Sequence, residues 1–477
     1  MLSLNNIDDS RIRAFATQVM ANLPYEPNEE QLGFIVALAR YLMYSSEGSL
    51  MLLSGYAGTG KTSLTGAVVK TLSQAGIKCV LLAPTGRAAH IFSEYSGHPA
   101  YTIHRKIYRQ KGYGSSAFNL AENKHTRTLF IVDEASMIAN ALGDSVATFG
   151  SGRLLDDLVT YVYNHQGCRL LLMGDDAQLP PVGQVDSPAL NENFMQAYGL
   201  TVFHMYLNEI ARQSLQSGIL HNATIVRHSM DEREGEQEPR LELEGFGDIV
   251  PLSSEFLLET IGDSYDRDGI NDTIVITRSN KRATMFNHGI RNTILYREDE
   301  LVCDDMLLVA KNNYYWAEEF EEMDFIANGD VARVRRVWGE IEHRYGLRFA
   351  NVTLEFPDHN NIEMDAKIVL DCLMSDTPAL SRDKADQLFN EVMAELPGDK
   401  RNKFKELKKH PYFNALQVKY AYAVTCHKAQ GGQWSNVFID MGGIAPEARQ
   451  SVDYKRWLYT AITRARRNVY LINYVPA

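Results

Sequence analysis

The 477-residue sequence predicts an α/β protein with two parallel-sheet units and a small β-rich insertion in the second unit. Three observations predict this fold. Four short, continuous apolar runs lie before residue 180, a second group of such runs lies beyond residue 270, and alternating segments interrupt that second group. Continuous apolar runs are typical of strands buried on both faces of a parallel sheet, whereas alternation is typical of strands with one solvated face.

The first four runs share one design, because each ends in a polar or glycine-rich cluster. In open α/β sheets, ligands bind just beyond the carboxyl ends of the strands, so these clusters are expected to meet at one edge. Helical patterns fit between them at 63–74 and near 151–165. The four predicted strands are LMLL (50–53), CVLLA (79–83), LFIV (129–132) and LLLM (170–173).

The second group predicts another parallel sheet, with an insertion that has β-like alternation at 330–338 and 350–356 and a turn signal at Asn328-Gly329. Its runs are TIVIT (273–277), YAYAV (420–424), NVFID (436–440) and NVYLI (468–472). The expected domains are 1–230 with a small hairpin insertion at about 107–126, an acidic connector over 231–248, a second domain formed by 249–300 and 412–477, and a β-rich insertion over 301–411.

Composition indicates a globular protein that works without a membrane. Hydrophobic residues make up 45% and charged residues 23%, and no stretch approaches the ~20 apolar residues of a membrane span. The start of the chain has no signal-peptide pattern, so a cytoplasmic location is expected. The five cysteines are scattered and predict neither a zinc site nor disulfides. The net charge of −12 argues weakly against a nucleic-acid partner, and the basic run at 397–410 predicts an exposed helix face rather than a polyanion contact.

The segment GYAGTGKT (55–62) matches the phosphate-binding loop, with a predicted strand before it and a helix after it. Its glycines let backbone N–H groups approach phosphate oxygens, and the following helix N-terminus favours negative charge. Lys61 is expected to reach the β- and γ-phosphates of ATP, and the Thr62 hydroxyl to bind Mg²⁺. A chance glycine-rich turn is the competing interpretation, and the strand–loop–helix context argues against it.

An acidic pair follows the third predicted strand in LFIVDEASMI. Asp133 is a candidate Mg²⁺ ligand, and Glu134 is a candidate for orienting or deprotonating the attacking water. After the fourth strand, Gln178 in GDDAQLPPVG has an amide suited to the γ-phosphate, although a proline-rich turn explains these residues equally well. Arg212 and Arg464 are candidates for stabilising charge during phosphoryl transfer, although an arginine seen in isolation is more often a surface residue.

In this order the motifs resemble a known family. GYAGTGKT, APTGRAA, VDEAS, GDDAQLPPVG, ARQ, VTCHKAQGGQW and YTAITRAR are similar to the helicase motifs of superfamily 1, and most similar to its RecD/Dda group of 5′→3′ DNA helicases. The resemblance spans roughly residues 25–475. It implies two RecA-like motor domains with hydrolysis of ATP between them, and an SH3-like accessory domain over 301–411.

The resemblance also implies roles for individual residues. Gln31 takes the place of the adenine-contacting glutamine, Asp133 and Glu134 hold metal and water, and Gln178, Arg212 and Arg464 contact the γ-phosphate. The implied catalytic set is Lys61, Asp133, Glu134, Gln178, Arg212 and Arg464, with Thr62 and Asp133 on Mg²⁺. The implied ATP-binding residues are Gln31, Gly55, Ala57, Gly58, Thr59, Gly60, Lys61, Thr62 and Ser63. The implied nucleic-acid contacts are Thr85, Gly86, Arg87, Thr102, His104, Thr425, His427, Lys428 and Gln430.

The expected activity is therefore an ATP-dependent motor that moves 5′→3′ on single-stranded DNA and unwinds duplex junctions, and a monomeric motor is compatible with the motifs. The 107–126 insertion takes the place of the strand-separating pin of this group, but its few bulky apolar residues argue against a wedge. An RNA-directed helicase and an ATP-gated single-strand binding subunit of a larger complex remain alternatives. A small-molecule kinase is a third, against which stand the second α/β unit and VTCHKAQG.

Overall fold

A computed structural model describes the chain as two compact units. Unit 1 contains the described residues up to Glu242 together with Arg449–Thr463, and unit 2 contains Leu243–Ala448 together with the chain from Arg464. Within the described residues, no helix is long and apolar enough to cross a membrane. The described residues are 9–110, 118–141, 149–165, 167–210, 216–230, 237–320, 323 and 325–476.

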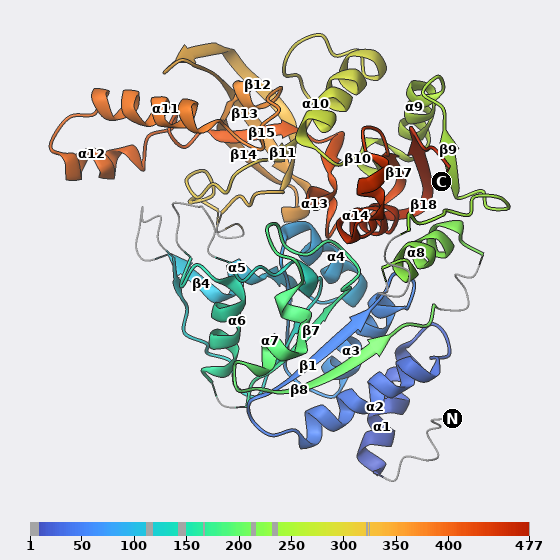
Figure 1. Ribbon diagram of the computed structural model, residues 1–477. Coiled ribbons are helices and arrows are strands. Elements are labelled where there is room, and N and C mark those ends of the chain that lie inside the picture. Colours follow the sequence, from blue (N-terminus) through green and yellow to red (C-terminus); the bar gives the residue numbers. More distant parts are fainter. Residues whose placement is uncertain are drawn as a thin grey trace. The chain divides into compact units, whose positions relative to one another are not determined.

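Unit 1 is built on a six-stranded, all-parallel sheet with the order β3-β2-β6-β7-β1-β8 (Figure 1). Its sheet strands are β1 (Ser49–Gly55), β2 (Cys79–Ala83), β3 (Ala100–Thr102), β6 (Leu129–Val132), β7 (Arg169–Gly174) and β8 (Thr201–Leu207). A separate hairpin pairs β4 (Tyr108–Gln110) with β5 (Phe118–Leu120). The helices are α1 (Ser10–Asn22), α2 (Glu29–Tyr44), α3 (Lys61–Gln74), α4 (Gly86–Ser96), α5 (Ile103–Ile107), α6 (Leu154–Tyr163), α7 (Glu192–Gln196), α8 (Gly218–His228) and α14 (Val452–Ile462).

Helices α1, α2, α3 and α4 cover one face of this sheet. Their apolar residues share a core with alternate strand residues, among them Met51, Leu53, Ile131 and Leu171. The intervening strand residues, such as Leu52, are also fully buried, so every residue of β1 is inaccessible to water. Burial on both faces explains why these strands are continuous apolar runs in the sequence.

Unit 2 combines a parallel sheet with a closed barrel (Figure 1). The sheet has the order β16-β10-β17-β18-β9, from β9 (Ile249–Leu252), β10 (Thr273–Thr277), β16 (Ala423–Thr425), β17 (Trp434–Asp440) and β18 (Ala465–Ile472). The barrel is formed by β11 (Met306–Val309), β12 (Val331–Arg344), β13 (Leu347–Phe356), β14 (Ile362–Val369) and β15 (Leu416–Tyr420). The helices are α9 (Leu257–Asp268), α10 (Asn280–Gly289), α11 (Arg382–Glu395), α12 (Lys400–Leu407) and α13 (Cys426–Ala429).

The two parallel sheets, the hairpin of the 107–126 insertion and the barrel confirm the fold class predicted from the sequence. One predicted strand was wrong. The run at 420–424 is divided, because Tyr420 ends β15 in the barrel whereas Ala423 begins β16 in the sheet. The chain passes from barrel to sheet within two residues, which an uninterrupted apolar run cannot reveal.

Three further features go beyond the sequence patterns. The insertion is not purely β, because α11 and α12 form a helical pair between β14 and β15. The barrel includes β15, which lies past residue 411. Helix α14 belongs to unit 1, where it packs against α8, although β17 and β18 on either side of it in the chain belong to the sheet of unit 2.

A buried charge cluster lies where barrel and sheet of unit 2 meet. Asp305 is fully buried and accepts two hydrogen bonds of 2.9 Å from Arg291 and one of 2.8 Å from Arg297. The Tyr422 hydroxyl, from the link between β15 and β16, also donates to Asp305 at 2.9 Å. Removing one partner from such a cluster leaves buried charge without compensation.

We expect Asp305→Asn to destabilise unit 2 by about 3 to 5 kcal/mol, because two arginines lose their carboxylate in a water-free site. Differential scanning calorimetry will show this as a lower unfolding temperature. The neighbouring substitution Asp304→Asn is the matched control, because the Asp304 side chain is 63% exposed and lies 3.9 Å from Arg335. Equal unfolding temperatures for the two variants would contradict the stabilising role of the cluster.

Candidate nucleotide site and nucleic-acid pocket

The carboxyl ends of β1, β6 and β7 lie side by side at one edge of the sheet of unit 1. Leu53 pairs with Met173, and Leu172 pairs with Val132, so the segments after these strands leave the sheet together. β2 extends the same edge, since Leu82 pairs with Val132. The parallel register therefore brings together the four clusters that the sequence analysis predicted to meet.

Two glycines of the phosphate-loop sequence have conformations that other residues rarely adopt. Gly58 and Gly60 have φ of 77° and 81°. A Cβ atom on Gly60 would lie 2.6 Å from the Tyr25 hydroxyl and 2.7 Å from Gln31 Nε2. The glycines thus let the loop turn tightly, as a phosphate cradle requires.

Lys61 and Gln31 both contact this loop. The Lys61 ammonium donates hydrogen bonds to the carbonyl oxygens of Gly55 and, at 2.9 Å, Tyr56. Gln31 is buried and donates to the Thr59 carbonyl at 2.8 Å, while its Oε1 accepts from the Asn28 backbone in a capping box at the start of α2. The Gln31 side chain therefore connects α2 to the loop by a hydrogen bond.

The acidic pair follows β6 as predicted. The Tyr95 hydroxyl donates to Asp133 Oδ2 at 2.6 Å, and the Glu134 backbone N–H donates to Asp133 Oδ1 at 2.9 Å. Burial, with the nearby charge of Asp133, raises the pKa of Tyr95 well above its usual range, so Tyr95 remains a donor. Glu134 has φ of 51°, a left-handed conformation that costs a non-glycine residue roughly 1 to 3 kcal/mol and is typical of functional sites.

A tyrosine on α14 connects the phosphate loop to the segment after β7. The Ala57 backbone N–H donates to the Tyr459 hydroxyl oxygen at 2.9 Å, and that hydroxyl donates to Asp175 Oδ2 at 2.7 Å. Tyr459 is buried, and burial together with Asp175 raises its pKa well above the usual range. Close by, the Leu179 backbone N–H donates to Thr460 of the same helix at 2.9 Å.

The residues at this edge fit a phosphate and a magnesium ion. Two buried oxygen atoms, Gln178 Oε1 and Ser136 Oγ, have no hydrogen-bond partner among the described residues. No side chain caps the N-terminus of α3, and Thr62 beside it is exposed. The described residues contain no group of three His, Cys, Asp or Glu side chains that could hold a metal ion. Mg²⁺ usually takes one or two carboxylates together with phosphate oxygens and water, and Asp133 and Thr62 at this edge carry oxygen atoms of that kind.

Of the two predicted arginines, only Arg464 lies among the described residues. Arg464 belongs to unit 2, where it is buried and its guanidinium donates to the Gly432 carbonyl at 3.4 Å. Its positive charge also lowers the pKa of the Cys426 thiol, although burial of that thiol is the larger effect and raises it. Arg212 lies outside the described residues.

The predicted nucleic-acid contacts of unit 1 follow β2 and β3. Thr85 and Thr102 act as N-caps of α4 and α5, with their hydroxyls accepting from Ala88 and Arg105 N–H groups at 3.2 Å. His104 packs edge-on against Phe149 with 4.9 Å between ring centres. Burial lowers the pKa of His104 to about 4, so this side chain is neutral at physiological pH. Gly86 is buried and Arg87 half-buried at the start of α4.

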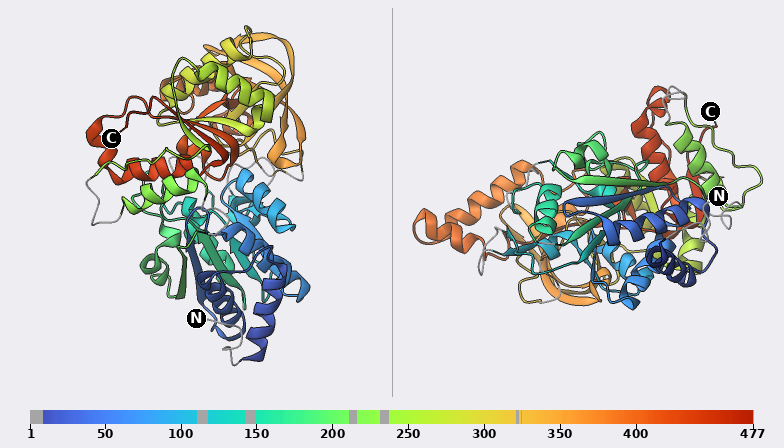
Figure 2. Two further views of the ribbon diagram at one scale, coloured as in Figure 1. Left: turned by 90° about the vertical axis from the view of Figure 1, so that its right-hand side faces the viewer. Right: turned by 90° about the horizontal axis from the view of Figure 1, so that it is seen from below.

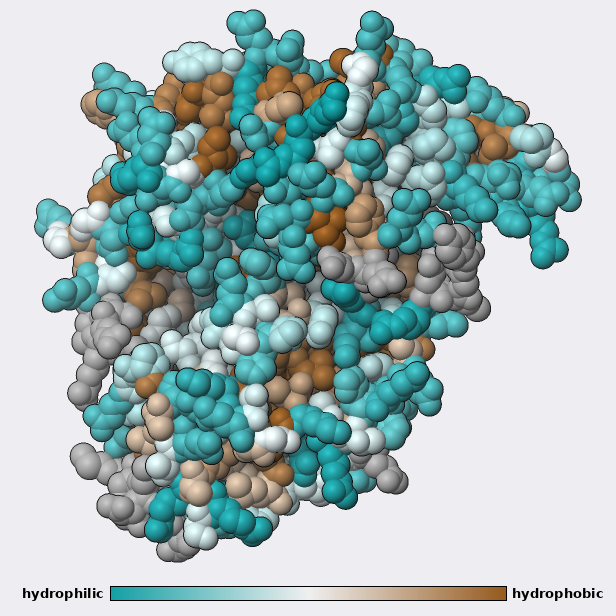
Figure 3. All heavy atoms as spheres, turned by 180° about the vertical axis from the view of Figure 1, so that it is seen from behind, coloured by the Kyte–Doolittle hydropathy of each residue, from teal (hydrophilic) through white to brown (hydrophobic). Residues whose placement is uncertain are grey.

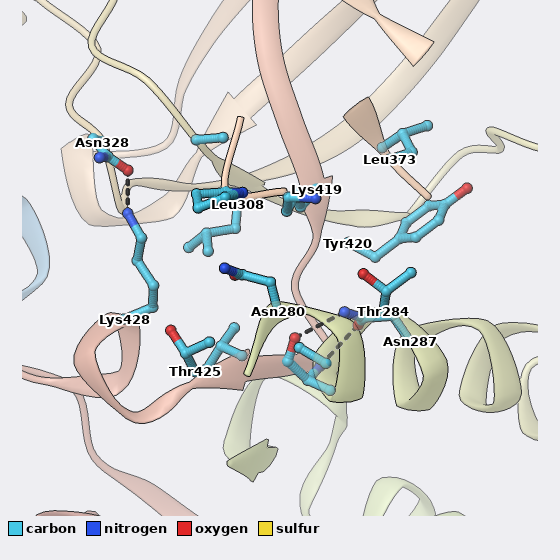
Figure 4. A pocket seen from close by; sticks show the side chains of 15 residues that line it. Asn280, Thr284, Asn287, Leu308, Asn328, Leu373, Lys419, Tyr420, Thr425 and Lys428 are labelled. Atoms are coloured by element: carbon cyan, nitrogen blue, oxygen red, sulfur yellow. Dashed lines mark hydrogen bonds between the residues drawn. The ribbon is translucent and has the colours of Figure 1, made fainter. Parts of the chain in front are cut away.

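In unit 2, a cavity of about 80 Å³ lies between α10, the barrel and the end of β16 (Figure 4). Thr425 and Lys428, both predicted nucleic-acid contacts, line it together with Lys419. Lys428 extends from α13 to the barrel, where it donates to Asn328. The described residues that line the cavity include two lysines and no Asp or Glu, so the site suits an anion. The two other predicted contacts in this segment do not line the cavity. His427 is exposed and Gln430 is buried.

Comparisons with known proteins agree with these motifs. The family model of an AAA domain matches residues 28–243, and that of a UvrD-like helicase C-terminal domain matches residues 420–472. The ATP-dependent RecD2 DNA helicase of Deinococcus radiodurans is 26% identical over 92% of the chain and 48% of its own length. The ATP-dependent DNA helicase dda of Enterobacteria phage T4 is 24% identical over 88% of the chain and 93% of its own length. The chain is thus similar to the RecD/Dda-like helicases of superfamily 1.

The chain spans about half the length of the RecD2 protein. Among solved structures, a Pif1 helicase from Bacteroides in complex with ADP-AlF3 and ssDNA has a TM-score of 0.46 and 15% identity, and the match covers 95% of this chain and 94% of that one.

Three residues of this candidate site were missed by sequence reasoning. They are Tyr95, Tyr459 and Thr460, which bond to Asp133, Asp175 and Leu179. Tyr459 and Thr460 stand in the motif YTAITRAR, only a few residues before Arg464, so that motif was the available signal. For Tyr95 the sequence has no signal, because only the packing of α4 on the sheet places it beside Asp133.

We expect Tyr459→Phe to lower the unfolding temperature of the protein, because Ala57 N–H and Asp175 both lose a buried partner, at a cost of about 1 to 3 kcal/mol. Differential scanning calorimetry or thermal fluorescence will measure it. The control is Tyr265→Phe, since the buried Tyr265 hydroxyl has no partner among the described residues. Equal effects from the two substitutions would show that the hydroxyl bridge adds nothing to stability.

Proposed function

We propose that this protein is an ATP-dependent motor that moves 5′→3′ along single-stranded DNA and unwinds duplex DNA at junctions. The observation that carries the proposal is the arrangement at the edge of the unit 1 sheet. There the phosphate loop, the acidic pair and Gln178 follow three neighbouring parallel strands. A second parallel sheet, in unit 2, carries a lysine-lined cavity at the end of β16. A phosphate site on one sheet and an anion site on another suit a motor that couples the hydrolysis of ATP to movement along a polyanion.

For ATP binding, we assign the phosphate oxygens to the backbone N–H groups of the loop and to Lys61. The ammonium of Lys61 now bonds to loop carbonyls, so binding exchanges those weak acceptors for charged oxygens. The positive φ of Gly58 and Gly60 gives the loop its tight turn, and a Cβ at either position would lie within 3 Å of a neighbouring side chain. The ATP-binding residues of the loop are Gly55, Ala57, Gly58, Thr59, Gly60, Lys61, Thr62 and Ser63, with Gln31 as the adenine contact.

For hydrolysis, we assign Thr62 and Asp133 to Mg²⁺, which supplies charge neutralisation for the phosphates when bound. Tyr95 orients Asp133 by donating to one of its oxygens. Glu134 positions the attacking water, and its left-handed backbone is a strained conformation of the kind found at functional sites. Gln178 has a buried amide oxygen that lacks a partner, which suits a residue that bonds to the γ-phosphate water.

Arg464 and Arg212 are the proposed contacts for the γ-phosphate charge that develops in phosphoryl transfer. A guanidinium offers two parallel N–H donors and stays charged at every relevant pH, which makes it better suited than lysine to a phosphoryl group. Arg464 belongs to unit 2.

For DNA, we propose contacts to the phosphate backbone rather than to bases. The proposed residues offer hydroxyl, amide and ammonium groups, which hold phosphates without reading sequence. The RecD2 and dda relatives, both named DNA helicases, support DNA over RNA as the strand. The proposed contacts are Thr85, Gly86, Arg87, Thr102, His104, Thr425, His427, Lys428 and Gln430.

Strand displacement with ATP and Mg²⁺ tests the proposal directly. We expect unwinding of a DNA duplex that carries a 5′ single-stranded tail and none of a duplex with a 3′ tail. Lys61→Ala is the matched control, in which hydrolysis and unwinding are lost while single-strand binding is retained. Unwinding from the 3′ tail alone would contradict the polarity, and hydrolysis that persisted in Lys61→Ala would contradict the phosphate-loop assignment. Stimulation of ATPase activity by RNA but not by DNA would contradict the substrate.

Single-strand affinity is expected to fall as pH rises through about 8. Burial lowers the pKa of Lys428 to about 8, against a smaller opposing effect of Asp330. Lys428 therefore carries its charge below that pH and loses it above, and a bound phosphate loses its cationic partner. The expected loss between pH 7 and pH 9.5 is about tenfold, which corresponds to one charge-assisted hydrogen bond of roughly 1.5 kcal/mol.

Fluorescence anisotropy with a labelled single strand across this pH range will measure the effect. Lys428→Arg is the control, because a guanidinium keeps its charge throughout and the affinity is expected to stay level. The same decline in both proteins would show that another group titrates.

A further inference from the structure

Helices α11 and α12 form a pair that projects away from the barrel of unit 2 (Figures 1 and 2). They are inserted between β14 and β15 and pack on the barrel through a small core of their own. Leu388 and Val392 of α11 and Leu407 of α12 are buried there with Phe349 of β13. The pair is thus a fixed part of unit 2.

One face of α12 and the turn after it carries only positive charge. At about 100° per residue, Arg401, Lys405, Lys408 and Lys409 fall within roughly 100° of one another around the helix axis. The turn continues past the end of the helix, since the Lys409 N–H donates to the Glu406 carbonyl at 3.0 Å. All four side chains are exposed, and the buried Leu407 lies on the opposite side. We name these four residues the basic face.

The basic face has no salt bridge among the described residues, although the exposed Glu406 lies between Lys405 and Lys408 in the sequence. Among the described residues, none of the four cations has a carboxylate within ion-pair distance, whereas Lys384 on the neighbouring helix α11 pairs with Asp371 at 3.2 Å. The nearest acidic residue in the sequence before the face, Asp399, is engaged as the N-cap of α12. Like charges at i and i+4, as in Arg401 and Lys405, destabilise a helix by about 0.2 to 0.5 kcal/mol per pair. The face therefore carries a small cost in stability that its own packing does not offset.

The positive charge of the basic face contrasts with the negative net charge of the whole chain. Residues 397–410 contain six Lys and Arg and two Asp and Glu, in a protein of net charge −12. The projecting pair is largely hydrophilic on its visible surface, at the right-hand side of the view from behind (Figure 3). A concentrated positive surface on an acidic protein attracts a polyanion to one place and repels it from the rest.

We propose that the basic face binds the phosphate backbone of double-stranded DNA. The inference rests on the proposed function, because it takes the polyanion to be the duplex that the motor unwinds. The face spans about 12 Å along the helix axis, at 1.5 Å per residue, and a helix of these dimensions fits the major groove of about 12 Å or bridges its two edges. A convex rod offers little to a flexible single strand, which prefers a groove.

The aromatic residue of α12 supports the duplex over the single strand. Single-strand sites combine positive charge with aromatic rings on which bases stack. Phe404 is 39% exposed, but its ring packs against Phe389 of α11 with 5.9 Å between centres. Its ring is thus used to join the two helices, and the basic face is left with cations alone.

The test measures binding to a labelled blunt-ended DNA duplex, without nucleotide, at several salt concentrations between 50 and 200 mM. The variant carries Arg401→Gln, Lys405→Gln, Lys408→Gln and Lys409→Gln. The matched control carries Arg40→Gln, Lys70→Gln, Lys78→Gln and Lys124→Gln, which removes one arginine and three lysines that are exposed in unit 1. A double variant, Lys405→Gln with Lys409→Gln, repeats the test with a smaller change in case the fourfold variant folds poorly.

We expect the fourfold variant to bind the duplex at least tenfold more weakly than the control, with the slope of log affinity against log salt reduced by about 3 to 4, since each lost phosphate contact accounts for about 0.9. The double variant is expected to reduce the slope by about half as much as the fourfold variant. ATPase stimulation by a short single strand is expected to be unchanged in both.

Duplex affinity equal to that of the control would overturn the inference. An equal loss of affinity for single-stranded and double-stranded DNA would also overturn it, because the face would then be a general or single-strand contact. Failure of the proposed function is a separate result, visible as wild-type protein whose ATPase activity no single strand stimulates, whatever the basic face does.

Discussion

The candidate nucleotide site depends on the parallel pairing of β6, β7 and β1. That pairing places the phosphate loop, the acidic pair and the segment with Gln178 at one edge, although more than a hundred residues separate the first from the last. A shift of one strand by a single residue would exchange its two faces, and buried leucines on both sides forbid it. The hydrophobic core thus sets the positions of polar groups that it does not touch.

The polar groups are then fixed by a second layer of hydrogen bonds from neighbouring helices. Gln31 from α2, Tyr95 from α4 and Tyr459 from α14 each donate a hydrogen bond to one segment of the candidate site. All three lie in sequence far from the segment they contact. Each bond is made in a buried setting, where an unpaired partner would be costly, so the loops have few alternative positions.

Much of the fold was predictable because it follows from local patterns. Continuous apolar runs located β1, β2, β6 and β7 of one sheet and β10, β17 and β18 of the other, but not β3, β8 or β9. The glycine-rich loop and the acidic pair predicted the phosphate chemistry of the candidate site. Non-local packing was not predictable. Nothing in the run at 420–424 indicates that Tyr420 pairs with Leu307 in a barrel while Ala423 pairs with Val275 in a sheet. The contacts of Tyr95 and Tyr459 were missed for the same reason, and the pairing of α11 with α12 was hidden by an insertion that otherwise alternates.

The barrel and the sheet of unit 2 share one continuous core, in which Leu307 and Val352 of the barrel pack in the same cluster as Val275 and Phe438 of the sheet. The barrel is therefore not an independent domain, and it cannot be replaced by substituting residues 301–411 alone. A replacement of the insertion that stopped before β15 would remove four of the five barrel strands. The fifth strand, β15, would remain next to the sheet with its apolar side chains uncovered. The α11–α12 pair, by contrast, lies between the end of β14 and the start of β15, so its removal would cut no barrel strand.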